Sequence, residues 1–360
     1  MALRRTPRPP LSARGGNGRL HRDKLGKPGR EETKETGMTI PRRTLGALLG
    51  ATALHAVAHA ADAYPARPVR IIVPFPPGGA LDALTRKVAQ KLSEQTSQQF
   101  FIENRTGATG TIGMGEAARA APDGYTLLAV DSTYAMIPYV FRQLSWDHAN
   151  GFLPISNCGA AASVLVVRRD APFATCEQLV EQARQRPEKI SYGSGGIGSV
   201  LHFATEAFQQ AAKIRLFHVP YRGAGDAMVG LLSGQVDLAL APTPATIEHV
   251  RGGQMRALAV TGASRSSVLT NVPTLAECGV PGLEFVYWTG LSAPQGTASE
   301  IVARLQAEIA RAMQAQDMRD FLATQGAEPG GLPTTAFAQL LRDESSRWRE
   351  VAAAAHIEQQ

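Results

Sequence analysis

The stretch "SYGSGGIGSVLHF" (Ser191–Phe203) contains Gly193, Gly195 and Gly198 at the spacing G-x-G-x-x-G. It follows a short expected strand and opens an expected helix, Ser199–Ala212. A dinucleotide site would also need an acidic residue about 20 positions later, at the end of the next strand. That strand contains no Asp or Glu. We therefore expect these glycines to bring backbone N–H groups and the positive end of the helix dipole close to a different anion.

Charge is unevenly distributed along the 360 residues, which carry a formal net charge of +6. Of the 37 Lys and Arg residues, 12 lie in residues 1–63, whereas only 5 of the 31 Asp and Glu residues lie there. The rest of the chain has 25 basic and 26 acidic residues and is close to neutral. This distribution predicts no basic surface for nucleic acid on the folded part.

The N-terminal segment divides into two parts. Residues 1–37 are polar and rich in Arg, Gly and Pro, which predicts a disordered or mis-assigned extension and leaves Met1 or Met38 open as the true start. Residues 38–63 combine two arginines, an apolar run that is too short to span a bilayer, and small residues. This order predicts a signal peptide and export to the periplasm.

Two A-x-A patterns place the expected cleavage near Ala60 or Ala63. The mature chain would then have about 297 residues, which suits two domains of ordinary size. Its three cysteines, Cys158, Cys176 and Cys278, are odd in number and show no C-x-x-C spacing. One disulfide and three free thiols both remain open for an exported protein.

Beyond the leader, short β-branched runs alternate with amphipathic helices. Pro68–Phe75 is predicted as a buried strand, and Ala80–Gln95 as a helix with one apolar face. Helices Ala298–Gln314 and Thr334–Ala355 are expected to finish the chain. Such alternation predicts an α/β fold with mostly parallel sheets.

The alternating segments form two sets. Extended crossings near Ile155–Ala160 and Glu284–Thr289 join them, and Phe152–Asn157 is predicted as an extended connection. We therefore expect two lobes with a cleft between them, and a hinge at the two crossings.

Three strand–glycine loop–helix units recur, at Pro74–Asp82, Thr106–Gly113 and Gly193–Ser199. Short hydroxyl residues stand at candidate N-cap positions in the second and third units. The first and third loops contain no Lys or Arg, which argues against a multiply charged phosphate. The pattern favours a carboxylate site made of backbone amides and hydroxyls.

Catalytic patterns are weak, so we predict neither an enzyme nor a metal or cofactor site. The sequence around Ser194 is not a G-x-S-x-G nucleophile elbow, because the second glycine comes one residue early. His202, His218 and His249 lack metal-ligand spacing. Asp226, like Asp82, falls in the first turn of an expected helix, where the dipole favours a carboxylate anyway.

Five segments together resemble the Bug family, the substrate-binding proteins of tripartite tricarboxylate transporters. They are "IIVPFPPGGALDALTR" (71–86), "IENRTGATGTIG" (102–113), "YGSGGIGSVLHFATEAF" (192–208), "HVPYRGAGDAMVGLLSGQVDLALAP" (218–242) and "LAVTGASRSSVLTNVPTLAECGVPGLE" (258–284). The resemblance covers residues 66–355. The sequence departs from the family pattern at Pro76 and Pro77. These prolines stiffen a loop in which the family often has Ala or Ser.

The resemblance implies a two-lobed type II periplasmic-binding fold that closes like a Venus flytrap, each lobe being a mostly parallel sheet flanked by helices. Lobe 1 would comprise residues 64–160 and 286–360, and lobe 2 residues 161–285. A small carboxylate would bind in the cleft through backbone amides and bridging waters. The monomeric protein, without cofactor, would deliver it to the large and small membrane subunits of the transporter. A ligand-sensing receptor and, less favoured, an enzyme on the same fold remain alternatives.

The family's ligand-contacting positions carry over to four groups of residues in this chain. In the first lobe they are Phe75, Gly78, Gly79, Ala80 and Asp82 in the first loop, Thr106, Gly107, Ala108 and Thr109 in the second loop, and Ser132, Thr133 and Tyr134 after the third strand. In the second lobe they are Ser194, Gly195, Ser199, His202, Tyr221 and Ala241.

Overall fold

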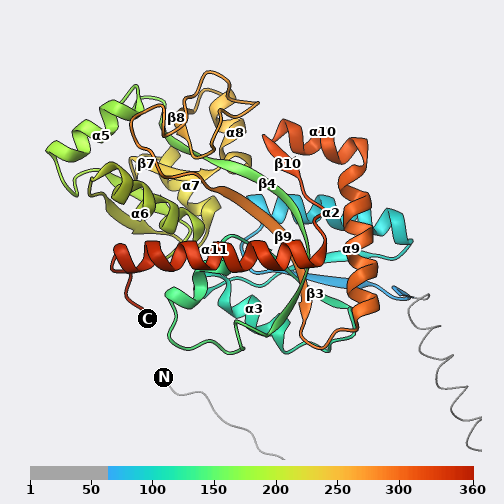
Figure 1. Cartoon of the computed structure of the whole chain (residues 1–360). Coiled ribbons are helices and arrows are strands. Elements are labelled where there is room, and N and C mark those ends of the chain that lie inside the picture. Colours follow the sequence, from blue (N-terminus) through green and yellow to red (C-terminus); the bar gives the residue numbers. More distant parts are fainter. Residues whose placement is uncertain (1–63) are drawn as a thin grey trace, which may run out of the picture. The chain divides into compact units, whose positions relative to one another are not determined.

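The computed structural model describes residues 64–360 (Figure 1). The predicted extension, signal peptide and cleavage sites lie outside these residues. The strands are β1 (Val69–Val73), β2 (Phe100–Asn104), β3 (Thr126–Asp131), β4 (Phe152–Arg168), β5 (Ser191–Ser194), β6 (Phe217–Pro220), β7 (Leu238–Pro242), β8 (Met255–Val260), β9 (Val286–Pro294) and β10 (Ala327–Pro329).

Helices follow most of these strands. They are α2 (Ala80–Thr96), α3 (Thr111–Ala118), α4 (Thr133–Met136), α5 (Cys176–Gln185), α6 (Val200–Ala212), α7 (Ala224–Leu232), α8 (Thr243–Arg251), α9 (Ser299–Gln314), α10 (Gln316–Thr324) and α11 (Thr334–Ala354), with 3₁₀ turns η1 (Ala108–Gly110) and η2 (Ile137–Tyr139). Within residues 64–360, no helix is both long and apolar enough to cross a membrane.

The sheet order is β2-β1-β3-β9-β4-β7-β5-β6, and β8 and β10 also pair with β4. Strand β1 runs parallel to β2 and β3, and β5 runs parallel to β6 and β7. These pairs come from strand–helix–strand units, so the predicted α/β alternation is confirmed. Antiparallel pairing is confined to β4, β9 and their neighbours.

Two long strands connect the halves of this sheet. The first part of β4 pairs with β9 from Phe152↔Pro294 to Ala162↔Val286, and its last part pairs with β7 and β8. The sequence predicts only an extended connection at Phe152–Asn157, with a separate strand starting later. The structure instead forms one strand of 17 residues, because its long-range pairing with β9 gives the connection a ladder of hydrogen bonds.

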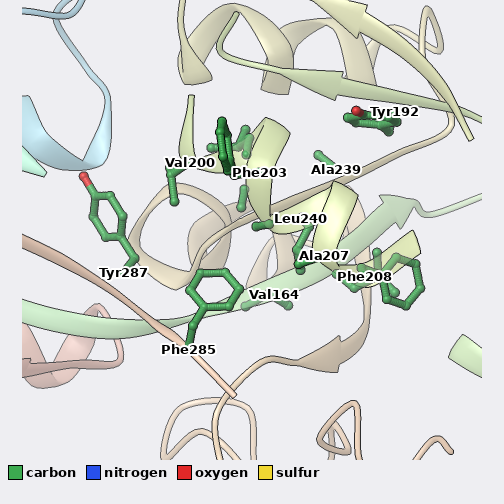
Figure 2. Packing of buried hydrophobic residues seen from close by; sticks show 14 of the residues in the cluster. Val164, Tyr192, Val200, Phe203, Ala207, Phe208, Ala239, Leu240, Phe285 and Tyr287 are labelled. Atoms are coloured by element: carbon green, nitrogen blue, oxygen red, sulfur yellow. The ribbon is translucent and has the colours of Figure 1, made fainter. Parts of the chain in front are cut away.

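The core has two parts, and the larger one extends over both halves of the sheet, since it includes Ile72 of β1 and Leu128 of β3. Buried residues of β1, α2 and α9 form the smaller cluster. The larger cluster includes Val164, Phe203, Phe208 and Leu240, and Figure 2 shows these side chains between α6 and the strands. Apolar burial of this kind stabilises the fold by about 1.5–3 kcal/mol for each large side chain.

Helix α11 crosses both parts of the molecule, as the red helix in Figure 1 shows. Its Trp348 is buried and meets Phe203 and Phe285 edge-on, with ring centroids 6.0 and 5.3 Å apart. Its Phe337 meets Trp288 of β9 in the same geometry. Edge-to-face contacts of this kind add to the energy of burial, so α11 anchors the crossing strand to the larger core.

Candidate functional site

Four helices begin around one small cavity between the two halves of the sheet. Helix α2 follows Gly79, α6 follows Ser199, α7 follows Gly223 and α8 follows Pro242. Residues from the starts of all four helices line a cavity of about 80 Å³. Because a helix start has unpaired N–H groups and the positive end of the dipole, the arrangement favours an anion.

The local sequence leaves three of the four helix starts without a capping side chain, although Pro244 removes one N–H group from the first turn of α8. Gly79 and Gly223 precede α2 and α7, and neither N-cap makes a side-chain hydrogen bond. At α6, by contrast, the Ser199 hydroxyl accepts from the N–H of His202 over 3.4 Å. The amides at the starts of α2 and α7 are therefore the best placed to bind a ligand.

Asp82 reaches this cavity but its carboxylate is already occupied. It accepts hydrogen bonds from Gly78 N, from Arg86 and from Asn104 Nδ2, at 2.8 to 3.0 Å. Burial opposes ionisation, but these donors outweigh it and hold the pKa of Asp82 below its usual value. The side chain therefore fixes the loop before α2 rather than offering a free charge.

Asp131 is the second carboxyl group in the wall, at the end of β3. Its side chain is only 5% exposed. Thr133 N donates to Oδ1 over 3.0 Å, and the Tyr287 hydroxyl donates to Oδ2 over 3.1 Å. Burial raises the pKa of Asp131 to about 6, although hydrogen bonding by Thr133 and Tyr287 opposes the rise. Among the described residues that line the cavity, none is Lys, Arg or His.

Tyr287 reaches the cavity from β9. In Figure 2 its ring stands away from Phe285, with the hydroxyl directed toward the N-terminal segment drawn in light blue. The ring also lines a second cavity of about 60 Å³, which shares Gly79 and Ala80 with the first. Thr289 lines this second cavity, and its buried hydroxyl has no hydrogen-bond partner among the described residues.

Two hydrogen bonds join the loops on the two sides of the cavity. The Thr109 hydroxyl donates to the carbonyl of Ile197 over 2.6 Å, and Val200 N donates to the Thr133 hydroxyl over 3.2 Å. A Cβ atom at Gly223 would lie 3.0 Å from the Pro76 ring. The two sides of the cavity are therefore in contact.

The loop that carries Thr109 has an uncommon backbone. Ala108 and Thr109 have φ values of 45° and 52°, and Gly107 before them has φ 125°. Left-handed angles are unfavourable for residues with a side chain and tend to occur where function demands them. Here they direct the Thr109 hydroxyl toward Ile197 on the opposite side.

The cavity brings together some of the residues predicted from the sequence. Those that line it are Phe75, Gly79, Ala80, Asp82, Thr133, Gly195 and Ser199. Gly78 lines the second cavity, and Tyr221 lines a surface groove together with Arg222. The other predicted positions are absent from the cavity lining: Thr106, Gly107, Ala108, Thr109, Ser132, Tyr134, Ser194, His202 and Ala241.

His202 and Ser194 belong to a buried polar cluster beside the cavity. The Ser194 hydroxyl lies 2.6 Å from His218 Nε2, and the His218 ring stacks between Tyr192 and His202 at 4.7 and 4.3 Å. Burial lowers the pKa of His218 to about 4 and, together with the neighbouring His218, that of His202 to about 3. This Ser–His pair lies outside the cavity lining, which favours a structural role.

Several lining residues were not predicted as ligand contacts. They are Pro76, Pro77, Leu81, Asp131, Val200, Leu201, Ala224, Gly225, Asp226, Pro242, Ala245 and Tyr287. A signal for Asp131 was present, since a carboxyl group directly ends the buried strand "TLLAVD". No local pattern marks Tyr287, which lies 156 positions further along the chain and reaches Asp131 only through the pairing of β3 with β9.

The protein has two sheet halves joined by crossing strands, and a cavity lined by helix starts lies between them. This arrangement defines a solute-binding protein of the two-lobed periplasmic type. The chain belongs to the tripartite tricarboxylate transporter family of receptors, whose family model matches residues 84–357. Protein BugT of Bordetella pertussis is 35% identical over 303 residues, covering 84% of this chain and 93% of BugT.

Solved structures agree with this assignment. Rpa4515 of R. palustris, solved with adipate, has a TM-score of 0.80 at 35% identity and covers 82% of this chain and 100% of its own. The periplasmic binding protein BugD has a TM-score of 0.78 at 30% identity, with 82% and 100% covered. MatC of Rhodopseudomonas palustris, with bound malate, reaches 0.76 at 30% identity, with 80% and 100% covered.

Proposed function

We propose that this receptor captures a small carboxylate in the cavity between its two halves and delivers it to the membrane subunits of a tripartite transporter. The observation that carries the proposal is the convergence of four helix starts on one cavity. Family membership supports it, and so do the relatives whose structures contain adipate and malate.

The ligand carboxylate would bind mainly to backbone N–H groups at the starts of α2 and α7. Both helices begin after a glycine without a capping side chain, so these donors are free. Hydrogen bonds from backbone amides to a charged group are stronger than those between neutral groups. The predicted contacts that do not line the cavity, such as Thr106 and Ala241, stay predictions.

Binding would close two lobes, residues 64–160 with 286–360 and residues 161–285, about the crossing strands β4 and β9. The pairing of β4 with β9 shifts register between Pro154 and Ser156 and between Asn157 and Gly159, and these irregularities support a hinge in this part of the two strands. The contacts of Thr109 with Ile197 and of Val200 with Thr133 would then belong to the closed state.

The protein would act in the periplasm as a monomeric receptor without catalytic activity. Signal peptide cleavage near Ala60 or Ala63 would release it, and N-terminal sequencing of exported material tests that position. The Ser194–His218 pair does not line the cavity, and this supports a receptor rather than a hydrolase.

A thermal-shift screen followed by calorimetry tests the proposal. The protein is unfolded and refolded to remove carried-over ligand, then mixed with mono- and dicarboxylates that include adipate and malate. A true ligand at 100 times its Kd adds about 2.7 kcal/mol to the free energy of unfolding. A screen in which no carboxylate raises the Tm would refute the proposed function.

A further inference from the structure

The carboxyl group of Asp131 is unlike the other buried carboxyl groups of the protein. Residues 64–360 contain four of them, Asp82, Asp131, Glu308 and Glu344. Asp82 pairs with Arg86, Glu308 with Arg304 and Arg311, and Glu344 with Arg347. Of these four carboxyl groups, only that of Asp131 has no ion pair within the described part of the chain. Asp131 is also the last residue of β3 and lines the cavity.

Such a group needs a partner, because a buried charge is costly unless it is paired. The hydrogen bonds from Thr133 N and the Tyr287 hydroxyl use one site on each oxygen of Asp131. A carboxylate can accept about four hydrogen bonds. Asp131 therefore keeps acceptor capacity, and it lines the cavity in which the ligand would bind.

The cavity thus offers two kinds of charge. Helix starts at Ala80 and Ala224 provide N–H donors and favour a negative group, whereas Asp131 favours a positive group or a strong donor. Most of the remaining lining is apolar, with side chains such as Phe75, Leu81 and Val200. A ligand carrying only carboxylates would place negative charge beside Asp131 with no lining cation to offset it.

We propose that the ligand is a small amino-carboxylic acid, whose carboxylate binds the helix starts and whose protonated amine binds Asp131. This inference rests on the proposed carboxylate-binding function and specifies its substrate class. Asp131 is then the residue that distinguishes amino acids from plain mono- and dicarboxylates, and Tyr287 holds its carboxylate in place.

Matched pairs of compounds test this inference by calorimetry at pH 7.5 on refolded protein. The pairs are 3-methylbutanoate with valine, butanoate with 4-aminobutanoate, and glutarate with glutamate. We expect the amine-containing member of at least one pair to bind tenfold or more tightly than its partner. This preference is measured on the unaltered protein, so it holds as a test even where a variant fails to fold.

The Asp131→Asn variant should lose at least tenfold in affinity for the preferred amino acid and gain affinity for its amine-free partner. Glu344→Gln is the matched control, because Glu344 is equally buried, also hydrogen-bonds an aromatic residue, Trp348, and lies on α11 outside the cavity. This control should leave both affinities unchanged.

Two results would overturn the inference while the proposed function stands. One is that, in every pair that binds, the plain carboxylate binds as tightly as its amino counterpart. The other is a dicarboxylate that binds only near or below pH 6, which would mean that protonated Asp131 donates to the ligand. Failure of every compound to bind would instead overturn the inference together with the proposed function.

Discussion

At the scale of single residues, the site and the polar cluster beside it contain buried groups whose pKa values are shifted. Asp131 has a pKa raised to about 6 by burial, while His218 and His202 have pKa values lowered to about 4 and 3. All three are held near the cavity by neighbouring aromatic or hydroxyl groups. Each shift changes the stability of the protein with pH in a defined direction.

The Asp131→Asn variant should be more stable than the unaltered protein above pH 6 when no ligand is present. A raised pKa means that Asp131 contributes stability fully below pH 3.8, and that this contribution is lost as pH rises through about 6. Asparagine stays neutral and avoids the loss. We expect a gain of roughly 1–3 kcal/mol at pH 7.5 and little difference at pH 3.5. Urea unfolding at both pH values measures it.

The histidine pair should make the protein sensitive to acid. Since both folded-state pKa values lie below the ordinary 6.5, the stability they contribute is present above pH 6.5 and is lost as pH falls toward 4 and then 3. The loss is on the order of 3 kcal/mol for His218 and 5 kcal/mol for His202. The His218→Gln variant should show a shallower fall between pH 6.5 and 4 in thermal unfolding. An equally steep fall would contradict this account.

At the scale of elements, close backbone packing fixes the position of a helix start beside the cavity. Gly195, after β5, lies against the start of α7, and a Cβ atom there would be 3.0 Å from Ala224 N and 3.2 Å from Gly223 C. Gly79 is different, with φ −78° and no atom within 4 Å of an added Cβ. A side chain at position 195 would therefore press on the backbone at the start of α7, whereas position 79 has room for one.

The Gly195→Val variant should lose ligand affinity by more than 100-fold while remaining folded. Its side chain would push against the backbone of Gly223 and Ala224 and displace the amides of α7 from the cavity. Arg222→Gln is the control, because Arg222 lines a separate surface groove. Calorimetry with the ligand from the screen compares the two. If Gly195→Val keeps binding and Arg222→Gln loses it, a salt bridge from Arg222 holds the ligand and the proposed amide site is wrong.

The C-terminal helix should be essential for stability through one side chain. Trp348→Ala removes a fully buried ring that contacts Phe203 and Phe285, and it leaves a cavity in the larger core. We expect a loss of about 3–5 kcal/mol in urea unfolding. The exposed neighbour Arg349, changed to Ala, should alter the free energy of unfolding by less than about 0.5 kcal/mol.

At the scale of the whole molecule, strands β4 and β9 connect the two halves of the sheet. Strands β4 and β9 run side by side through the middle of the sheet order, so movement of one half relative to the other must bend both. Two hydrogen bonds cross the cavity, and the Thr109–Ile197 bond, at 2.6 Å, is shorter than the Val200–Thr133 bond, at 3.2 Å. A few such contacts suit a closure that ligand binding can reverse.

Ligand binding should therefore compact the protein in solution. Small-angle X-ray scattering should give a smaller radius of gyration with saturating ligand than without it. Thr109→Val removes the hydrogen bond to Ile197 and should weaken binding by about 2- to 10-fold, as expected for one net hydrogen bond. An unchanged radius of gyration with a ligand verified by calorimetry would argue against closure.

Sequence reasoning performed best where the information is local. The predicted helices Ala80–Gln95 and Thr334–Ala355 agree with α2 and α11 to within one residue at each end. It performed less well for the cavity. A residue that matches one of the family's ligand contacts in sequence can still point its side chain away from the cavity. His202 is on the expected helix, yet its ring stacks on His218 rather than lining the cavity.

The sequence by itself determined the α/β alternation, the three glycine loops and the family, since these depend on residue types at short spacings. Only the tertiary structure decided which loops face one another and which groups share the cavity. Asp131 and Tyr287 are 156 positions apart and meet because β3 pairs with β9. Likewise, β4 is one continuous strand because distant partners provide its hydrogen bonds. Such pairings arise from long-range contacts, which no short segment of the chain encodes.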